Sequence, residues 1–452
     1  MSDKEALQLD DNFPKTDKSW KSFLMFYLVL AALFFVMFTM RSTVSLLQVF
    51  VPDLSSTFAV SEGTIAITFT IYNLSAAFVS LVIGPVVERF GYKIMITTGM
   101  FIFAGAILLS TFATEFWMIA TTQAIAGIGA AFFGPANIAY AGDYFPKEKR
   151  TVAIGLIMSS FYVGSIVAVP INSYIGDVLD WRWGIRIMAI FSFFVFLLIL
   201  LAVPRIKGMN IRKRKVQQPN LSAEVDTINS QIENETQISY VNRMKQVLSN
   251  KYAVGTFFIT LFQRGGLFAM TTLLSTWLEA KFSMGTTIIG IIFMAAGAAA
   301  LVSNTFFSWV ANKIGKKIII LGGTILTAIW IGIFPLISFT SALAITNIII
   351  LNFVGGISMG SYNTFVTEVA PQSKGTALAI NNTFGQISQA GATAIIGKII
   401  FDLTGEYIYC GFAAMGIYVI CVILMFVFIR PKEIEKFNES EKKKQNNGTG
   451  LS

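Results

Sequence analysis

The stretch Asp143-Tyr-Phe-Pro-Lys-Glu-Lys-Arg-Thr151 lies between two long apolar segments of the chain. It returns 225 residues later as Glu368-Val-Ala-Pro-Gln-Ser-Lys-Gly-Thr376, with an acidic residue, the proline, a lysine and the threonine in the same places. Random apolar sequence would not also repeat its short charged loops in register. The stretch therefore predicts a chain made of two matching halves.

Two further short segments repeat at an offset of 224 residues. Phe58-Ala-Val-Ser61 returns as Phe282-Ser-Met-Gly285, and Phe90-Gly-Tyr-Lys-Ile94 returns as Ile314-Gly-Lys-Lys-Ile318. Many secondary transporters consist of two such repeats around a site in the middle of the bilayer. The repeat on its own favours that architecture.

The composition of the chain places it in a membrane. Of its 452 residues, 54% are hydrophobic and only 13% are charged, and the mean hydropathy is +0.67. A soluble chain is nearer a quarter charged, so this one could not cover a globular surface. We predict an all-α membrane protein of twelve transmembrane helices in two pseudo-symmetric six-helix bundles.

The twelve predicted helices are apolar runs that each meet the roughly 20-residue length needed to span a bilayer. They lie at about 22–50, 64–83, 94–113, 116–142, 152–175, 184–203, 252–278, 286–309, 318–339, 342–366, 376–400 and 407–429. We expect the domains to be a tail at 1–20, a first bundle at 21–205, a linker loop at 206–250, a second bundle at 251–430 and a tail at 431–452.

The basic residues predict the orientation of the chain. Of the 34 Lys and Arg residues, 28 lie in the two tails and in the loops on the same side as the tails. The opposite side holds only Arg182, Arg186, Lys281 and Lys398. Because cytoplasmic loops are enriched in Lys and Arg, we expect both termini in the cytoplasm of a plasma (inner) membrane. The net charge of +9 then follows from topology, and no nucleic-acid partner is needed to explain it.

Several classes of chemistry are excluded by residue type. The chain has no histidine, which removes imidazole metal sites and Ser-His-Asp triads. Its two cysteines, Cys410 and Cys421, are eleven helical residues apart in one apolar run, about 16 Å of rise, so they cannot pair with each other. Phosphate-binding glycine loops are missing from the loops. We therefore predict no enzyme, no catalytic residues, no metal and no cofactor.

The loop after the second apolar run reads Gly84-Pro-Val-Val-Glu-Arg-Phe-Gly-Tyr-Lys93. It resembles the signature loop of the major facilitator superfamily, Gly-x-x-x-Asp-Arg-x-Gly-x-Lys/Arg, with Glu88 in place of the usual Asp. The segment from Asp143 to Arg150 and the run Asp180-Trp-Arg-Trp183 also resemble that family. The resemblance covers roughly residues 20 to 430.

The resemblance implies two six-helix bundles that rock around a central cavity. It also implies a cytoplasmic latch, in which charged residues of the loops hold that side of the protein together. The alternative is ordinary solvation of charged loops. The latch residues implied in this way are Gly84, Glu88, Arg89, Gly91, Lys93, Asp143 and Arg150.

Two segments are similar to the drug-efflux branch of the family. Gln123-Ala-Ile-Ala-Gly-Ile-Gly129 looks like a segment that drug/proton antiporters begin with Arg, and Gly164-Ser-Ile-Val-Ala-Val-Pro170 resembles their glycine-proline motif. Gln123 replaces the charged member, which puts proton coupling through this site in doubt. No deep carboxylate or histidine offers another proton carrier.

Two arginines lie inside predicted spans. Arg41 is in the first run and Arg264 is near the middle of the seventh, and the repeat offset places them at nearly equivalent depth. An ionisable side chain in the middle of a span costs about 2.5–3.5 kcal/mol, so it indicates a functional site. A guanidinium suits a carboxylate or a phosphate, and this pairing resembles organophosphate and organic-anion members of the superfamily. The alternative is that each arginine snorkels or pairs structurally.

Amides and hydroxyls supply the other candidate substrate contacts. Asn382, Gln386 and Gln389 fall on one face of the eleventh predicted helix, which would be turned away from lipid. The alternative for these residues is hydrogen bonding between helices. The weaker substrate-binding candidates are Asn137, Tyr162, Asn352, Tyr362 and Asn363.

These features together predict a secondary active transporter of a small organic solute, an anion bearing a carboxylate or phosphate, that works by alternating access. Drug or metabolite efflux by proton antiport is the first alternative, and a non-transporting membrane receptor is the second. The expected partners are a small-molecule substrate and the lipid bilayer, with a coupling ion left open and a functional monomer as the working unit.

Overall fold

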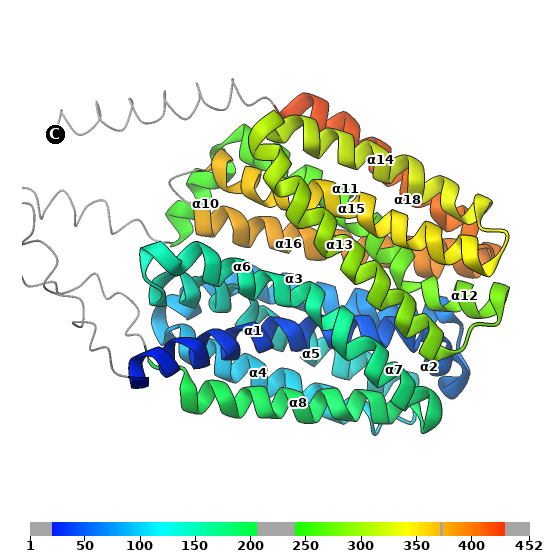
Figure 1. Cartoon of the computed structure of the whole chain (residues 1–452), viewed down its shortest axis with the longest axis horizontal. Helices are drawn as coiled ribbons and strands as arrows, with labels where there is room; N and C mark the ends of the chain where they lie inside the picture. The colour runs from blue at the N-terminus through cyan, green and yellow to red at the C-terminus, as the bar shows by residue number, and fades with distance from the viewer. Residues whose placement is uncertain (1–19, 206–239, 371–373, 430–452) are drawn as a thin grey trace, which may run out of the picture.

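A computed structural model describes residues 20–205, 240–370 and 374–429, and every regular element in these ranges is a helix (Figure 1). The first half contains α1 Trp20–Val49, α2 Val51–Phe58, α3 Glu62–Phe90, α4 Tyr92–Ser110, α5 Phe116–Tyr144, α6 Lys147–Val163, the π-helix η1 Gly164–Ala168, α7 Val169–Val178 and α8 Trp181–Ala202. The second half contains α10 Tyr240–Ser249, α11 Lys251–Thr272, α12 Leu274–Phe282, α13 Thr286–Ile314, α14 Lys316–Ile337, α15 Ser341–Val369, α16 Lys374–Ala392, the π-helix η2 Thr393–Phe401, α17 Asp402–Thr404 and α18 Tyr407–Phe428.

The long helices present apolar side chains to the outside of the protein. Leu201 is 83% exposed, Trp117 74% and Phe78 73%, which only a lipid environment would favour. Eleven described helical segments are long and apolar enough to cross a bilayer. The all-α membrane fold predicted from the sequence is therefore confirmed.

The twelfth predicted helix, at 376–400, corresponds to α16 and η2, which follow one another without a gap. This segment is not among the eleven, and it carries the amides Asn382, Gln386 and Gln389. The count of twelve therefore stays a prediction.

The backbone repeats with the same offset as the sequence. Ala59 and Ser283, which lie 224 residues apart, end α2 and α12 in the left-handed conformation with φ of 51° and 52°. Gly91 and Gly315, also 224 apart, join consecutive helices at φ of 83° and 99°. Glycine suits the second pair because it adopts positive φ without steric cost. The predicted pairing of the two halves thus extends to individual backbone angles.

The structure differs from the sequence-based expectation at several boundaries. The predicted run 252–278 is divided, because α11 gives way to α12 at Leu273. The predicted run 22–50 matches α1, and a short helix that was not predicted, α2, follows it after Phe50. The predicted linker 206–250 ends in a helix, α10, whose Val247 is buried. The rest of that linker, the predicted tails at 1–19 and from residue 430 onwards, and residues 371–373 lie outside the described residues.

The end of the protein that carries α2 and α12, here called the distal end, lies opposite the start of α1 and α10 (Figure 1). The two halves meet there across the repeat. The Nε2 of Gln48 donates to Oγ1 of Thr272 at 3.1 Å, and these two residues are 224 positions apart. A residue that contacts its own repeat equivalent lies beside the pseudo-twofold axis. This pair therefore marks where the axis crosses the interface.

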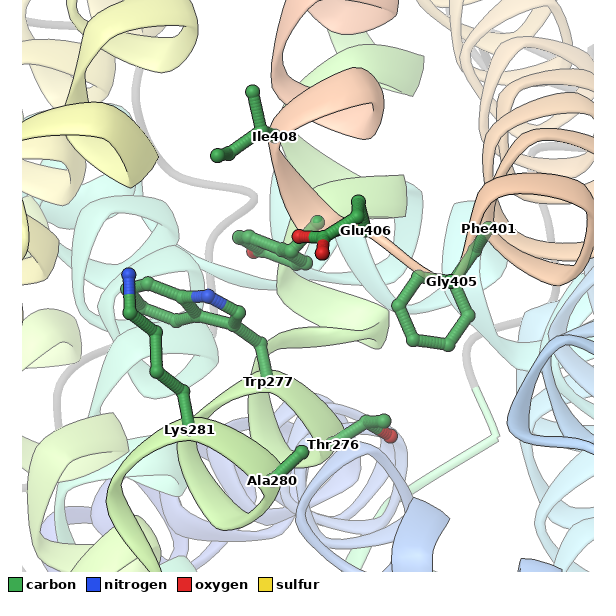
Figure 2. A pocket seen from close by; sticks show the side chains of 9 residues that line it. Thr276, Trp277, Ala280, Lys281, Phe401, Gly405, Glu406 and Ile408 are labelled. Carbon is green, nitrogen blue, oxygen red and sulfur yellow. The ribbon is translucent and has the colours of Figure 1, made fainter.

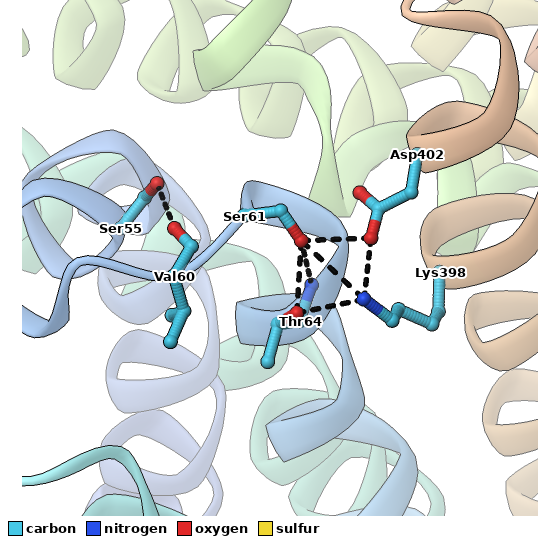
Figure 3. Close-up of polar contacts among 6 residues, drawn as sticks. All are labelled: Ser55, Val60, Ser61, Thr64, Lys398 and Asp402. Atoms are coloured by element: carbon cyan, nitrogen blue, oxygen red, sulfur yellow. Dashed lines mark hydrogen bonds and ion pairs between the residues drawn. The ribbon is translucent and has the colours of Figure 1, made fainter.

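Charged groups close one side of the distal interface. Lys398 of η2 donates to Oγ1 of Thr64 at 2.8 Å and to Oδ2 of Asp402 at 2.5 Å, and Ser61 donates to the same carboxylate at 2.7 Å (Figure 3). Backbones also approach closely here, because a Cβ at Gly397 would lie 2.9 Å from the Cβ of Ala66. This polar contact joins the start of α3 to the end of η2.

The other side of the distal interface joins carboxylates of the first half to the start of α13. The Oγ1 of Thr287 donates to Oδ2 of Asp177 at 2.6 Å, and Oγ1 of Thr286 donates to Oδ2 of Asp53 at 3.4 Å. The partial positive charge of a helix N-terminus favours carboxylates at this position. Every hydrogen bond between the halves that the described residues show lies in the distal part of the helices.

Closure of the distal end is expected to depend on pH through Asp53. Burial, followed by repulsion from Glu279, Asp177 and Asp180, raises the pKa of Asp53 to about 6, while the hydrogen bond from Thr286 opposes the shift. When the distal end opens, water reaches Asp53 and its pKa falls towards about 3.9. Closure therefore takes up a proton. Protonation favours the closed form fully below about pH 4, and this contribution is lost as the pH rises through about 6.

The measurement is the distance between spin labels on Ser56→Cys and Ala280→Cys, at exposed positions of α2 and α12. In the otherwise native chain, lowering the pH from about 8 to about 5 should increase the short-distance population. Asp53→Asn should reduce the response, leaving the part that comes from Glu279, whose pKa burial also raises. Glu115→Gln, a distal carboxylate outside this cluster, should keep the full response. A response of the same size in Asp53→Asn would contradict the assignment.

Candidate functional site

Arg41 and Arg264 lie at the same depth in equivalent helices. Each is eight residues before the last residue of its helix, α1 for Arg41 and α11 for Arg264. Eight residues correspond to about 12 Å of helix, so both side chains lie inside the bundle rather than at its distal surface. Both are half-buried. The equal depth that the sequence predicts is present in the structure.

The guanidinium of Arg264 is held by two amides. Its Nη2 donates to Oδ1 of Asn363 on α15 at 3.1 Å, and its Nη1 donates to Oδ1 of Asn382 on α16 at 3.3 Å. A Cβ at Gly385 would lie 2.7 Å from Cδ of Arg264, so glycine leaves the space that the side chain occupies. These acceptors are neutral, and the arginine therefore keeps its full charge.

The guanidinium of Arg41 has different surroundings. Its Cζ lies 5.2 Å from the centre of the Phe161 ring, and it donates no hydrogen bond to any of the residues that the structure describes. Tyr162, next to Phe161, is close enough to both Arg41 and Arg264 to be within range of their charges. Both arginines therefore lie in the neighbourhood of Tyr162.

Two other candidates from the sequence lie in contacts between helices. The hydroxyl of Tyr362 donates to the carbonyl of Thr256 at 2.5 Å and is hydrogen-bonded to Thr260 at 2.9 Å, and the residue is 2% exposed. The side chain of Asn137 is fully buried and donates to the carbonyl of Leu33 at 3.0 Å. Such contacts correspond to the alternative of hydrogen bonding between helices, and a substrate role for either residue stays a prediction.

The predicted polar face of α16 is divided by its contacts. Asn382 accepts from Arg264, whereas Oε1 of Gln386 is buried without a hydrogen-bond partner among the described residues. Gln389 is half-buried one turn further along. The face thus begins at the arginine and continues towards the distal interface, where Thr70 donates to the carbonyl of Ala390 at 3.1 Å.

Two residues of this site, Phe161 and Gly385, were not among the candidates chosen from the sequence. Phe161 adjoins the chosen Tyr162, and Gly385 lies three residues after the chosen Asn382, so helical spacing could have indicated both. Asn363 was one of the weaker candidates, and the structure shows that it contacts Arg264.

The implied cytoplasmic latch is described only in part. Gly91 lies between α3 and α4, and Lys93 donates from Nζ to the carbonyl of Leu200 at 2.9 Å. Asp143 is exposed, and Nε of Arg150 is buried without a hydrogen-bond partner among the described residues. The surroundings of Gly84 and the side chains of Glu88 and Arg89 are not among those that the structure describes. The latch stays a prediction.

A pocket of about 330 Å³ lies at the distal surface of the second half (Figure 2). Trp277 and Phe401 stand on opposite sides of it, and the ring of Trp277 stacks on that of Tyr407 with centroids 4.9 Å apart. Lys281 and Glu406 also line it. None of the candidate site residues lies in its wall, so this pocket is separate from the two arginines.

Comparison with known proteins agrees with this fold. The family model described as Major Facilitator Superfamily matches residues 33–393. The chain is 23% identical over 392 residues to an uncharacterized MFS-type transporter, YwfA, of Bacillus subtilis (strain 168), covering 87% of this chain and 88% of the relative. It is 26% identical over 364 residues to the sialic acid transporter NanX of Escherichia coli (strain K12), covering 78% and 82%.

The fold is also similar to a solved structure. The crystal structure of a D-xylose-proton symporter matches 89% of this chain and 98% of its own, with a TM-score of 0.71 and 13% sequence identity. At that identity the likeness concerns the fold alone. With the family match over most of the chain and the many apolar helices, it identifies the chain as a multi-pass membrane protein and a secondary transporter that belongs to the major facilitator superfamily.

Proposed function

We propose that this transporter carries a small organic anion with a carboxylate or phosphate group, and that Arg41 and Arg264 bind the anion. The observation that carries the proposal is the pair of guanidinium groups at equal depth, with Tyr162 near both. No Asp or Glu is among the fully buried side chains of the described residues. The two positive charges therefore have no carboxylate partner of the protein at their depth.

The chemistry of the pair favours an anionic ligand. Removing a charge from water is unfavourable unless a partner of opposite charge replaces the water. Two like charges in the same low-dielectric region also repel each other. An anion between them removes both costs, and the planar guanidinium can bind a carboxylate or phosphate through two hydrogen bonds.

The closed distal end supports alternating access. The hydrogen bonds between the halves in the described residues lie distal to the arginines, so we infer that a solute reaches the arginines from the opposite side, where α10 lies. We propose that both termini are cytoplasmic in the plasma membrane, because the basic residues are concentrated on that side. The structure then corresponds to the inward-facing state of a functional monomer.

The relatives add support for an anion. NanX is named a sialic acid transporter, and sialic acids carry a carboxylate. Drug or metabolite efflux by proton antiport stays an alternative, but it needs a titratable group inside the bundle. The polar residues around the arginines, Asn363, Asn382 and Tyr162, offer no carboxylate for that role.

The anion site is tested by ligand-induced stabilisation of the purified protein. We would measure thermal unfolding with a panel containing N-acetylneuraminate, sugar phosphates, neutral sugars and organic cations. A ligand at about 100 times its Kd stabilises a protein by about 2.7 kcal/mol, which raises the unfolding temperature. We expect stabilisation by at least one anion, and its loss in Arg41→Gln and Arg264→Gln.

Arg182→Gln is the matched control. It also removes an arginine, but Arg182 lies at the distal surface of the first half, where it donates to the carbonyl of Ala113. It should keep the stabilisation. Stabilisation by neutral or cationic solutes alone, or an anion whose effect survives both central substitutions, would contradict the proposal.

The orientation is tested with single cysteines and a membrane-impermeant maleimide on intact cells. The native cysteines are buried, so they contribute little background. Ser56→Cys at the distal end should react from outside, and Lys317→Cys at the other end should react only after the membrane is opened. The reverse pattern would show that the termini are external.

A further inference from the structure

The two arginines of the site differ in their hydrogen bonds. Arg264 donates to two amide oxygens, at 3.1 Å and 3.3 Å, whereas Arg41 lies against Phe161 and donates to no residue in the described part of the chain. A repeat that places two arginines at the same depth does not by itself require this difference. The halves have therefore diverged around a shared pair of charges.

We propose that Asn363 and Asn382 are positioning residues that fix Arg264 before an anion arrives, so that Arg41 supplies the unengaged hydrogen-bond donors of the site. This inference rests on the anion function proposed above. Neither amide needs to touch the anion. Each acts through the guanidinium that it holds.

Amides suit this role because their oxygens accept hydrogen bonds without neutralising the arginine. A carboxylate at either position would form an ion pair with Arg264 and compete with the transported anion. Fixing a long side chain in advance also reduces the conformational entropy that is lost on binding. The pair of amides therefore retains the charge of Arg264 while restricting its motion.

The packing of α16 restricts Arg264 further. Asn382 and Gly385 are three residues apart on one helical face, and a Cβ at Gly385 would lie 3.0 Å from Nη1 of Arg264. A Cβ at Gly265, the neighbour of Arg264, would lie 2.5 Å from the carbonyl oxygen of Ser388. Helices α11 and α16 are thus in close contact on both sides of the arginine.

All parts of this arrangement belong to the second half. Asn363 is on α15, Asn382 is on α16 and Arg264 is on α11, so the three should move together when the halves rock. Arg41 moves with the first half. An anion that contacts both arginines would then join a fixed donor on one half to an unengaged donor on the other.

The test measures the reactivity of each arginine towards phenylglyoxal, by mass spectrometry of the full-length protein in detergent. In the native chain Arg41 should react faster than Arg264. Each single variant, Asn363→Ala or Asn382→Ala, should make Arg264 react about tenfold faster, the change expected for the loss of one hydrogen bond to a charged group. The double variant should accelerate Arg264 further, while Arg41 stays unchanged. Asn382→Asp should instead slow the reaction of Arg264, because it adds a carboxylate partner.

Asn352→Ala is the matched control, since this amide lies on α15 and donates only within its helix, to the carbonyl of Ile348 at 3.0 Å. It should leave both rates as they are. The proposal is overturned if the double variant leaves Arg264 unchanged, or if both arginines accelerate together, which would indicate general loosening. The two single alanine variants give the same readout should the double variant fail to fold.

Protection by N-acetylneuraminate and by inorganic phosphate in the same assay separates this inference from the anion function. If the amide variants behave as expected but no anion of the thermal panel slows labelling of Arg41, the positioning role stands and the anion function fails. If an anion protects Arg41 while the amide variants leave Arg264 unchanged, the anion function stands and the positioning role fails.

Discussion

The central constraint on this protein is the presence of two positive charges inside membrane-spanning helices, with no Asp or Glu among the fully buried side chains of the described residues. Arg41 and Arg264 each lie about 12 Å from the distal end of their helix. Charges at that depth are unfavourable unless a partner is supplied. The protein supplies neutral amides to one arginine and an aromatic ring to the other. Neither the amides nor the ring neutralises the charge of the arginines. A transported anion would do so.

The repeat explains how the two charges come together. Halves that match to within a residue, down to Ala59 and Ser283 at the ends of α2 and α12, place equivalent helices on either side of one axis. Gln48 and Thr272 lie beside that axis at the closed end. Polar contacts such as those of Lys398 and Asp177 then hold the distal end together. Beside them an apolar cluster packs Val49, Ala66 and Val169 of the first half against Leu273 and Ile396 of the second. The distal interface therefore combines hydrogen bonds with buried apolar contacts.

Much of the fold could be predicted from the sequence because lipid imposes strong rules. Apolar length locates spans, basic residues indicate orientation, and the repeated polar loops divide the chain into halves. The same rules do not predict where a long run breaks, as at Leu273, since apolar residues lie on both sides of that break. Helix α10 was also not predicted, because its sequence is polar and short and its burial depends on helices distant in the chain.

The site was predictable in its charges and less so in its contacts. Arg41 and Arg264 are charged residues inside apolar segments, which made them candidates from the sequence alone. The spacing of amides along α16 placed Asn382 on a polar helical face. Which amide reaches the guanidinium depends on packing between α11, α15 and α16, which helical periodicity within one element cannot show. Tyr362 illustrates the limit, because its hydroxyl bonds to Thr256 and Thr260 in a contact between helices.

The most direct test of the account is solute counterflow in proteoliposomes. Vesicles would be preloaded with the unlabelled anion that stabilises the protein most strongly, and accumulation of the same labelled anion would be followed over time. The account predicts accumulation by the native chain and by Arg182→Gln, and none by Arg41→Gln or Arg264→Gln. Undiminished accumulation in both central variants would contradict the claim that these arginines bind the transported solute.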